Sequence, residues 1–169
     1  DTPINGLAHC VGSIDLKPLK LSKKEDFIKT FNLNLISATE IIRAMHENLK
    51  TNNGSIVLFS TVAARKGFTN HSIISSAKAA IEGLTVSLAA EFAPNVRVNC
   101  VAPSLTKSKI AEFLLKNEKI AEGIAKLHPL KRIGEGIDFS ALASFLLSKD
   151  SSWITGQIIG VDGGRSSVA

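Results

Sequence analysis

Tyrosine is absent from this chain of 169 residues, and aromatic residues make up only 5% of it. No reaction that depends on a phenol can therefore be assigned to its own side chains. Cysteine is almost as rare, because Cys10 and Cys100 are the only two and they lie far apart, each inside an apolar run. Their spacing excludes a disulfide framework and a clustered metal site. We expect a reduced, buried pair and no metal, as in a cytoplasmic protein.

No apolar run approaches the roughly 18 residues that a membrane-spanning helix needs. The first residues, "DTPING", are polar, which does not fit a secretory signal peptide. A long basic run is missing as well. The formal net charge of +5 comes from scattered lysines and arginines with little aromatic interleaving. We therefore expect neither a membrane nor a nucleic acid as a partner.

The sequence does contain a globular composition, 44% apolar and 21% charged, with four short apolar runs. These runs are nearly continuous rather than alternating, which is typical of strands in a parallel sheet that is covered on both faces. The four predicted strands are residues 6–12, 55–60, 96–102 and 157–162.

Helical patterns fill the intervals between these strands. The first pattern begins at "SKKE", where Ser22 would cap the helix and Glu25 would complete a capping box. The second stops before Pro94. Because strands and helices alternate, we predict an α/β fold of the Rossmann type with a doubly wound parallel sheet. The predicted helices are residues 22–50, 72–92, 107–126 (as one or two helices) and 137–148.

The glycine-rich phosphate loop of such folds, G-x-G-x-x-G, does not occur in this sequence. The chain also opens directly with a buried-type strand, and nothing before that strand can pair with its other edge. We therefore expect residues 1–169 to be the single C-terminal portion of a Rossmann-type domain, with the N-terminal βαβ half absent from this chain. Without the loop, these residues alone should bind a dinucleotide weakly.

Several motifs, separated along the chain, occur in a fixed order. A strand ending in glycine is followed by "NLNL", "FST", "SAKAAIEGLT", "VRVNCVAP" and "WITGQIIGVDGG". This order and spacing closely resemble the C-terminal two-thirds of a short-chain dehydrogenase/reductase, and the resemblance covers essentially the whole chain. It implies hydride transfer between a nicotinamide cofactor and a carbonyl or alcohol.

The resemblance also implies roles for single residues. In that family a tyrosine passes the proton, and a lysine four residues later lowers its pKa and binds the nicotinamide ribose. A serine polarises the carbonyl, and an asparagine helps to hold a water in the proton relay. Lys78 matches the lysine, Asn34 in "NLNL" matches the asparagine, and Thr61 falls at the serine position. A threonine hydroxyl can still donate one hydrogen bond, but the tyrosine position holds Ile74, which cannot donate a proton.

A histidine stands where a different subfamily has its phenol. Enoyl reductases of the same superfamily place their tyrosine seven residues before the lysine, and here that residue is His71. Residues 71, 74 and 78 share one helix face, and an imidazole can serve as a proton donor at neutral pH. The segment "HCVG" at 9–12 is also similar to the His-Ser-Ile-Gly strand end of enoyl reductases. Two plainer interpretations stay open, an exposed His71 at a helix N-terminus and a solvated Lys78.

Other matches concern the cofactor pocket. Gly12 ends the first strand, where a side chain would obstruct the cofactor. The segment "APSLTKS" is similar to the family's Pro-Gly-x-x-x-Thr, whose backbone and hydroxyl meet the carboxamide. Pro103 is retained, whereas Ser104 replaces the glycine and Ser108 the threonine. The alternative interpretation of this segment is a loop that caps the next helix and has no role in cofactor binding.

The stretch of residues 105–130 corresponds to the family's substrate lid. It carries an apolar stripe that could line a pocket for a hydrophobic substrate, although a packed helix face would show the same stripe. The stripe consists of Ile110, Phe113, Leu114, Ile120 and Ile124.

The expected function is that of a short-chain dehydrogenase/reductase-like oxidoreductase acting on a small carbonyl or enoyl substrate. Its cofactor would be NAD or NADP, and the residue that discriminates between them lies outside this chain. The alternative is an inactive member of the family that keeps the fold for binding or assembly. Loss of the tyrosine favours that alternative, and retention of Lys78, Asn34 and Thr61 opposes it.

A homo-oligomer, either a dimer or a tetramer, is the expected assembly. The helices at 22–50 and 72–92 carry more apolar surface than one face of a sheet can cover. The resemblance implies the same, because family members pair these two helices across a two-fold axis.

Overall fold

A computed structural model describes residues 3–168, and its centre is a four-stranded sheet in the order β1-β2-β3-β4. All three strand pairs are parallel. Each connection therefore crosses over the sheet, and the predicted doubly wound α/β fold is confirmed. The strands are β1 (Gly6–His9), β2 (Ser55–Phe59), β3 (Arg97–Pro103) and β4 (Ile158–Val161).

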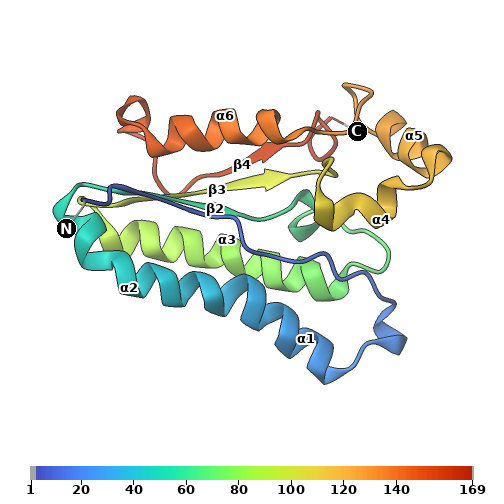
Figure 1. Ribbon diagram of the computed structural model, residues 1–169, viewed down its shortest axis with the longest axis horizontal. Coiled ribbons are helices and arrows are strands. Elements are labelled where there is room, and N and C mark those ends of the chain that lie inside the picture. Colours follow the sequence, from blue (N-terminus) through green and yellow to red (C-terminus); the bar gives the residue numbers. More distant parts are fainter. Residues whose placement is uncertain (1–2, 169) are drawn as a thin grey trace.

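Helices cover both faces of this sheet, as Figure 1 shows. Helix α6 lies on one face, and α2 and α3 lie on the other. The short helices α4 and α5 lie beyond the carboxyl ends of the strands (Figure 1). The helices are α1 (Lys24–Phe31), α2 (Ser37–Thr51), α3 (Ser72–Phe92), α4 (Glu112–Leu115), α5 (Glu118–Lys126) and α6 (Gly136–Leu147).

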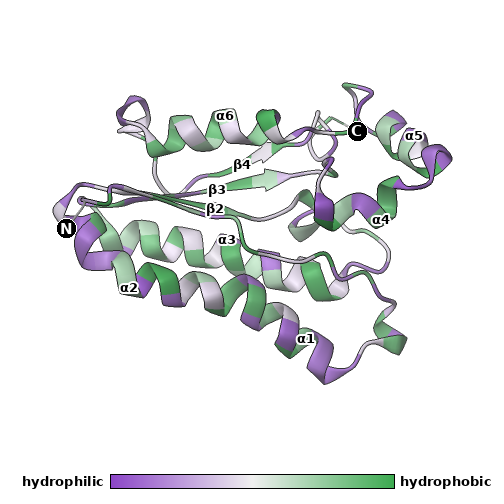
Figure 2. Cartoon of the chain, viewed as in Figure 1, coloured by the Kyte–Doolittle hydropathy of each residue, from purple (hydrophilic) through white to green (hydrophobic). Residues whose placement is uncertain are grey.

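The two cores explain why the central strands are continuously apolar. Successive side chains of a strand point to opposite faces. Ile56 accordingly packs in the core beneath α2 and α3, and its neighbour Val57 packs in the core beneath α6. Both are fully buried, as is Leu146 of α6. Figure 2 shows that α3 and α6 are largely hydrophobic, whereas α2 carries both hydrophobic and hydrophilic residues.

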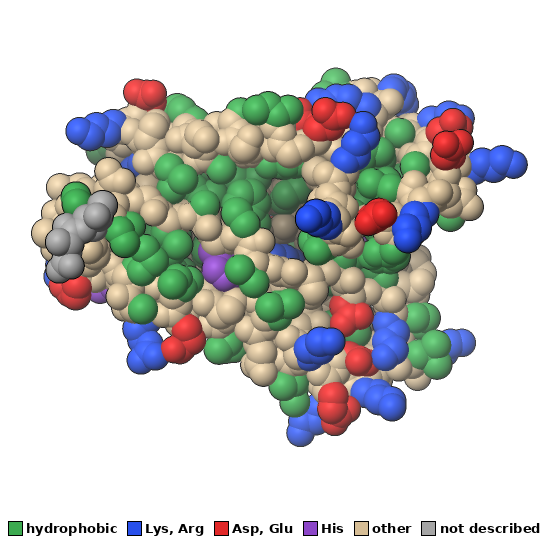
Figure 3. Space-filling view, in the orientation of Figure 1, with side chains coloured by type: hydrophobic (Ala, Val, Ile, Leu, Met, Phe, Trp, Pro, Cys, Tyr) green, Lys and Arg blue, Asp and Glu red, His purple; other side chains and the backbone are tan. Residues whose placement is uncertain are grey.

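The first strand is shorter and more open than its sequence predicts. It ends at His9 rather than at residue 12, and Ala8 within it is exposed. Among the described residues it pairs with β2 alone, so one of its edges is free. Figure 3 shows hydrophobic side chains gathered in the hollow between α6 and this edge.

The two cysteines differ, so the expected buried pair is wrong for one of them. Cys100 in β3 is fully buried, and burial raises the pKa of its thiol to about 12. Cys10 is exposed because it follows the end of β1, where the chain has left the sheet.

The predicted start of the first helix is wrong by one residue. The N-cap is Lys23, and the carboxylate of Asp26 accepts its backbone N–H at 2.9 Å. Lys17 Nζ donates to the same carboxylate at 2.6 Å. Ser22 instead donates its hydroxyl proton to the Pro18 carbonyl at 3.1 Å. An acidic residue in the first turn still does the capping, since it satisfies a free N–H and favours the positive end of the helix.

The predicted helix at 72–92 is confirmed as α3. By length and composition it could cross a membrane. It packs along β3, however, and buries Ile73, Ile81 and Ala89. Its place against the sheet accounts for part of its apolar composition, and Val86 on the same helix is 51% exposed.

Candidate active site

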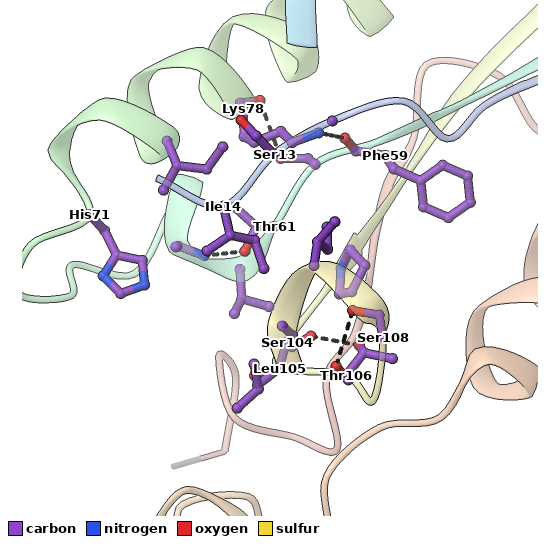
Figure 4. Close-up of a pocket in the computed structure, with 18 of the residues that line it drawn as sticks. Ser13, Ile14, Phe59, Thr61, His71, Lys78, Ser104, Leu105, Thr106 and Ser108 are labelled. Carbon is purple, nitrogen blue, oxygen red and sulfur yellow. Dashed lines mark hydrogen bonds between the residues drawn. The ribbon is translucent and has the colours of Figure 1, made fainter. Parts of the chain in front are cut away.

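A cavity of about 380 Å³ opens at the carboxyl ends of the strands. Its walls come from the loops that follow β1, β2 and β3, from the first turns of α3, and from the segment between β3 and α5. Figure 4 shows side chains from these separate elements converging on it. In open parallel sheets this edge is where ligands bind, and the volume suits a small molecule.

Lys78 reaches this cavity from the second turn of α3. Its ammonium donates to the carbonyl of Phe59, the last residue of β2, at 2.9 Å (Figure 4). Burial lowers the pKa of Lys78, because water is largely removed from around its charge. An ammonium has three donors. One is used on the strand end, and within the described part of the chain the other two have no acceptor.

Asn34 lies behind the cavity wall and is fully buried. It belongs to a π-helical segment, Asn32–Ile36, that joins α1 to α2. Its Nδ2 donates to the Thr30 carbonyl at 2.9 Å and to the Ser13 hydroxyl at 3.2 Å, while its Oδ1 accepts the Ser13 N–H at 3.4 Å. Asn34 thus ties the loop after β1 to the helix. π-Segments are frequent at functional sites, and the periodic sequence carried no signal for this one.

Gly12 is constrained by the same asparagine. A Cβ at this position would lie 2.8 Å from Oδ1 of Asn34 and 3.2 Å from Nζ of Lys78. Real Cβ atoms essentially never lie under 3.0 Å from such a neighbour, so the asparagine would have to shift. The glycine therefore lets the loop after β1, the amide of Asn34 and the ammonium of Lys78 approach one another. This packing requires glycine at position 12 whether or not a cofactor is bound.

Thr61 and Ser60 follow β2, and the structure separates their roles. Ser60 donates its hydroxyl proton to Glu82 at 2.9 Å, and Glu82 pairs with Arg65 at 2.7 Å. Thr61 lines the cavity, and its hydroxyl oxygen accepts the Ala63 N–H at 3.3 Å. Its hydroxyl proton remains available to a ligand.

His71, Ile74 and Lys78 all line the cavity, so the predicted shared helix face is confirmed. Ile74 is 4% exposed and occupies the wall between the other two. His71 is the N-cap residue of α3, and its Nδ1 lies 2.7 Å from the Thr69 carbonyl. A carbonyl only accepts, so Nδ1 carries the proton and Nε2 is left free. His71 is therefore a cavity residue and not merely a solvated helix end.

Pro103, the last residue of β3, and Ser108 in the loop that follows both line the cavity. The hydroxyl of Ser108 donates to the Thr106 carbonyl at 3.4 Å (Figure 4). Ser108 is also the N-cap of a single 3₁₀ turn, so the plainer capping interpretation holds alongside the cavity position. Of the predicted site residues, only Asn34 does not line the cavity.

The segment at 105–130 covers the cavity with only part of its apolar stripe. Ile110, Leu114 and Ile124 line the cavity. Phe113 and Ile120 do not, and they are 54% and 51% exposed. The stripe is divided because the chain breaks into two short helices, α4 and α5, rather than forming one continuous helix.

Two residues were missed from the sequence, Arg165 in the cavity and His128 behind its wall. Arg165, just beyond "VDGG", lines the cavity, and Ser104 is bonded to the buried His128 at 2.8 Å. His128 stands in "LHPL" and Arg165 follows a turn, and neither setting carries a functional signal. His9, the last residue of β1, was also missed; it does not line the cavity, and burial, followed by the charge of Lys78, lowers its pKa.

Comparison with known proteins places this geometry in context. A family model described as enoyl-(acyl carrier protein) reductase matches residues 2–166. A tropinone reductase homolog of Arabidopsis thaliana is 39% identical over 163 residues, which cover 95% of this chain and 62% of that protein. Human dehydrogenase/reductase SDR family member 4 is 35% identical over 146 residues, which cover 85% of this chain and 52% of that protein.

Solved structures agree with these relatives. The aldohexose dehydrogenase of Thermoplasma acidophilum superposes with a TM-score of 0.92 at 27% identity, over 98% of this chain and 69% of that one. ElxO with NADP bound superposes with a TM-score of 0.89 at 28% identity, over 96% and 67%. The chain spans 62% and 52% of the lengths of the two curated relatives named above.

Proposed function

The chain belongs to the short-chain dehydrogenase/reductase family, and from this premise we propose that its protein is an NAD(P)-dependent oxidoreductase that reduces a small carbonyl or enoyl compound. The observation that carries the proposal is the convergence of Lys78, Thr61 and Gly12 on one cavity. These three come from α3, from the residues after β2 and from the loop after β1, and together they supply a cation, a hydroxyl donor and an open backbone approach in one place.

The residues present fit the nicotinamide half of a dinucleotide. Lys78 has two ammonium donors without an acceptor, which suits the neighbouring hydroxyls of a ribose. Gly12 keeps the strand end free of a side chain beside that ammonium. Pro103 and Ser108 would meet the carboxamide. The cofactor, when bound, supplies the hydride.

The side chains of this chain would act on the substrate oxygen. The hydroxyl proton of Thr61 would be donated to it, which polarises the double bond. His71 would deliver the proton from Nε2 when its ring is protonated, while Nδ1–H stays bonded to the Thr69 carbonyl, and Nε2 would regain a proton from solvent. Asn34 would act as a positioning residue, because it holds the Ser13 loop without touching the cavity.

Two further features of the whole protein belong to this proposal. We place the protein in the cytoplasm as a homo-oligomer, a dimer or tetramer. Exposed apolar side chains on α2 and α3, among them Ile41 (39%) and Val86 (51%), support an interface on these helices. Residues 105–130 would serve as the lid over the substrate.

The test is turnover by the full-length gene product. Oxidation of NADH and of NADPH would be followed by the loss of absorbance of the reduced nicotinamide, with a panel of ketones and enoyl thioesters as substrates. Cofactor binding would be measured in parallel. Turnover with any member of the panel supports the proposal.

An inactive, ligand-binding protein is the second candidate, and one observation favours it. The buried Ile74 occupies the wall where the family has its proton-passing tyrosine, and the chain has no tyrosine to replace it. Tight cofactor binding without turnover of any substrate would favour this candidate over the reductase.

A further inference from the structure

The cavity has an unusual charge distribution. Its lining includes two formally charged side chains, Lys78 and Arg165, and no aspartate or glutamate among the described residues. The proposed function uses Lys78 for the cofactor. Arg165 has no part in it, although it stands in the same cavity. What remains of the lining is mostly aliphatic.

Arg165 has no carboxylate in direct contact among the described residues. Within residues 3–168 no carboxylate lies within 4.0 Å of its guanidinium. The acidic residue in the same turn, Asp162, accepts the N–H groups of Gly164 at 2.9 Å and Ser166 at 2.7 Å. Partial burial lowers the pKa of Arg165, because its charge has lost part of its water, and the more distant charge of Asp162 opposes this only in part. A half-buried cation of this kind is open to an anion.

The guanidinium is held in place rather than left mobile. It stacks over the ring of Phe68, 4.7 Å from the ring centre. Its Nη1 donates to the Ser104 hydroxyl at 3.4 Å. The Arg165 carbonyl also accepts Lys66 Nζ at 2.8 Å, which fixes the backbone.

A directed chain of hydrogen bonds supports this arrangement. Nδ1 of His128 lies 2.8 Å from the Ile124 carbonyl and must be the donor, because a carbonyl only accepts. Nε2 of the neutral ring therefore accepts the Ser104 hydroxyl at 2.8 Å. The Ser104 oxygen is then left with lone pairs for Arg165. His128 is only 2% exposed, so the chain is anchored in the protein interior.

We propose that Arg165 recognises a carboxylate on the substrate, so that the substrate class is a carbonyl or enoyl acid with an apolar body. The planar guanidinium matches the two oxygens of a carboxylate. The aliphatic walls, among them Ile14, Leu16 and Leu114, match the apolar body. This inference rests on the proposed function, since it names the substrate of the same site.

A matched pair of probes tests it on the full-length gene product. The acid is 2-oxohexanoate and the neutral control is its methyl ester. Arg165→Met removes the charge from the cavity, and Arg165→Lys retains the charge without the planar fork. Lys149→Met is the control variant, because Lys149 is exposed at a distant turn and loses the same charge. Thermal melts confirm that each variant folds.

We expect wild type and Lys149→Met to prefer the acid over the ester. Hydrogen bonds to charged groups are worth about 1.5–3 kcal/mol, so Arg165→Met should reduce the preference about 10- to 100-fold, mainly through KM. Arg165→Lys should fall in between. The inference is overturned if Arg165→Met leaves the ratio of the two probes unchanged, including when both probes weaken equally.

A binding measurement separates this inference from the proposed function. Calorimetry of 2-oxohexanoate against the NADP-loaded protein needs no turnover. If the acid binds in an Arg165-dependent way but no cofactor is oxidised, the inference stands and the reductase proposal fails. If both probes are reduced and Arg165→Met keeps the acid-to-ester preference of the wild type, the reductase proposal stands and the inference fails.

Discussion

Gly12 approaches Asn34 so closely that a Cβ on the glycine would lie 2.8 Å from the asparagine's Oδ1. The close approach links the loop after β1 to the π-helical segment, 22 residues further along at Asn34, and Nζ of Lys78 would lie 3.2 Å from the same Cβ. The loop after β1, the π-helical segment and α3 therefore pack together only because residue 12 has no side chain.

Gly12→Ala should shift Asn34 and weaken the site. Overpacking of this kind typically costs about 1–3 kcal/mol. We expect a lower melting temperature and weaker NAD(P)H binding by the full-length protein, measured by thermal denaturation and by cofactor fluorescence. Gly67→Ala is the matched control, because a Cβ there meets nothing within 4 Å. Equal behaviour of the two variants would show that the close approach is unimportant.

His71→Ala should lower the rate of carbonyl reduction. The proposed proton donor would be lost, and general acid catalysis contributes roughly 10²–10⁴-fold. Steady-state kcat with saturating cofactor is the measurement. His46→Gln serves as the control, since His46 lies on α2 against Phe92, outside the cavity. An unchanged kcat in His71→Ala would remove the histidine from the mechanism.

Ile74→Tyr, introduced into the His71→Ala variant, should restore activity. Residue 74 lies one helical turn before Lys78 on the same cavity wall, so a phenol there would have its pKa lowered by the nearby ammonium. We expect recovery of a large part of the lost rate. Ile74→Phe in the same background supplies the ring without the hydroxyl and should recover nothing. Equal rescue by both would mean that cavity shape, and not proton donation, limits the rate.

Asp138→Asn should destabilise the protein in a pH-dependent way. Hydrogen bonds from Arg132, at 2.6 and 2.7 Å, lower the pKa of Asp138 from 3.8 to about 2, and its carboxylate also accepts the Glu135 N–H at 2.8 Å. Because the pKa is lower in the folded state, the stabilisation is complete above about pH 4 and is lost as the pH falls toward 2.

The measurement is the difference in melting temperature between wild type and Asp138→Asn from pH 7 to pH 2. This difference should be largest near neutrality and shrink below pH 4. Glu40→Gln is the comparison, because the Glu40–Arg43 pair is exposed at the surface and should contribute little. A pH-independent difference for Asp138→Asn would mean that the lost capping geometry, not the charge, is responsible.

The sequence by itself determined the fold class, the order of the strands and helices, and which residues of α3 face the cavity. The side chains that a strand or helix buries recur at a fixed spacing along the sequence. A continuous apolar run marks a strand covered on both sides, as Ile56 and Val57 show, and a spacing of three or four marks one face of a helix. The cavity positions of His71, Ile74 and Lys78 follow from that period. The absence of tyrosine needed no structure at all.

Only the tertiary structure decided which distant residues meet. Arg165 and Ser104 are 61 positions apart, yet a parallel sheet brings the carboxyl ends of all its strands to one edge, and there they bond. The exposure of Cys10 depends on where the chain leaves the sheet, and the π segment at Asn34 depends on contacts with the loop after β1. No local period encodes these features, because each arises from packing between segments that are remote in sequence.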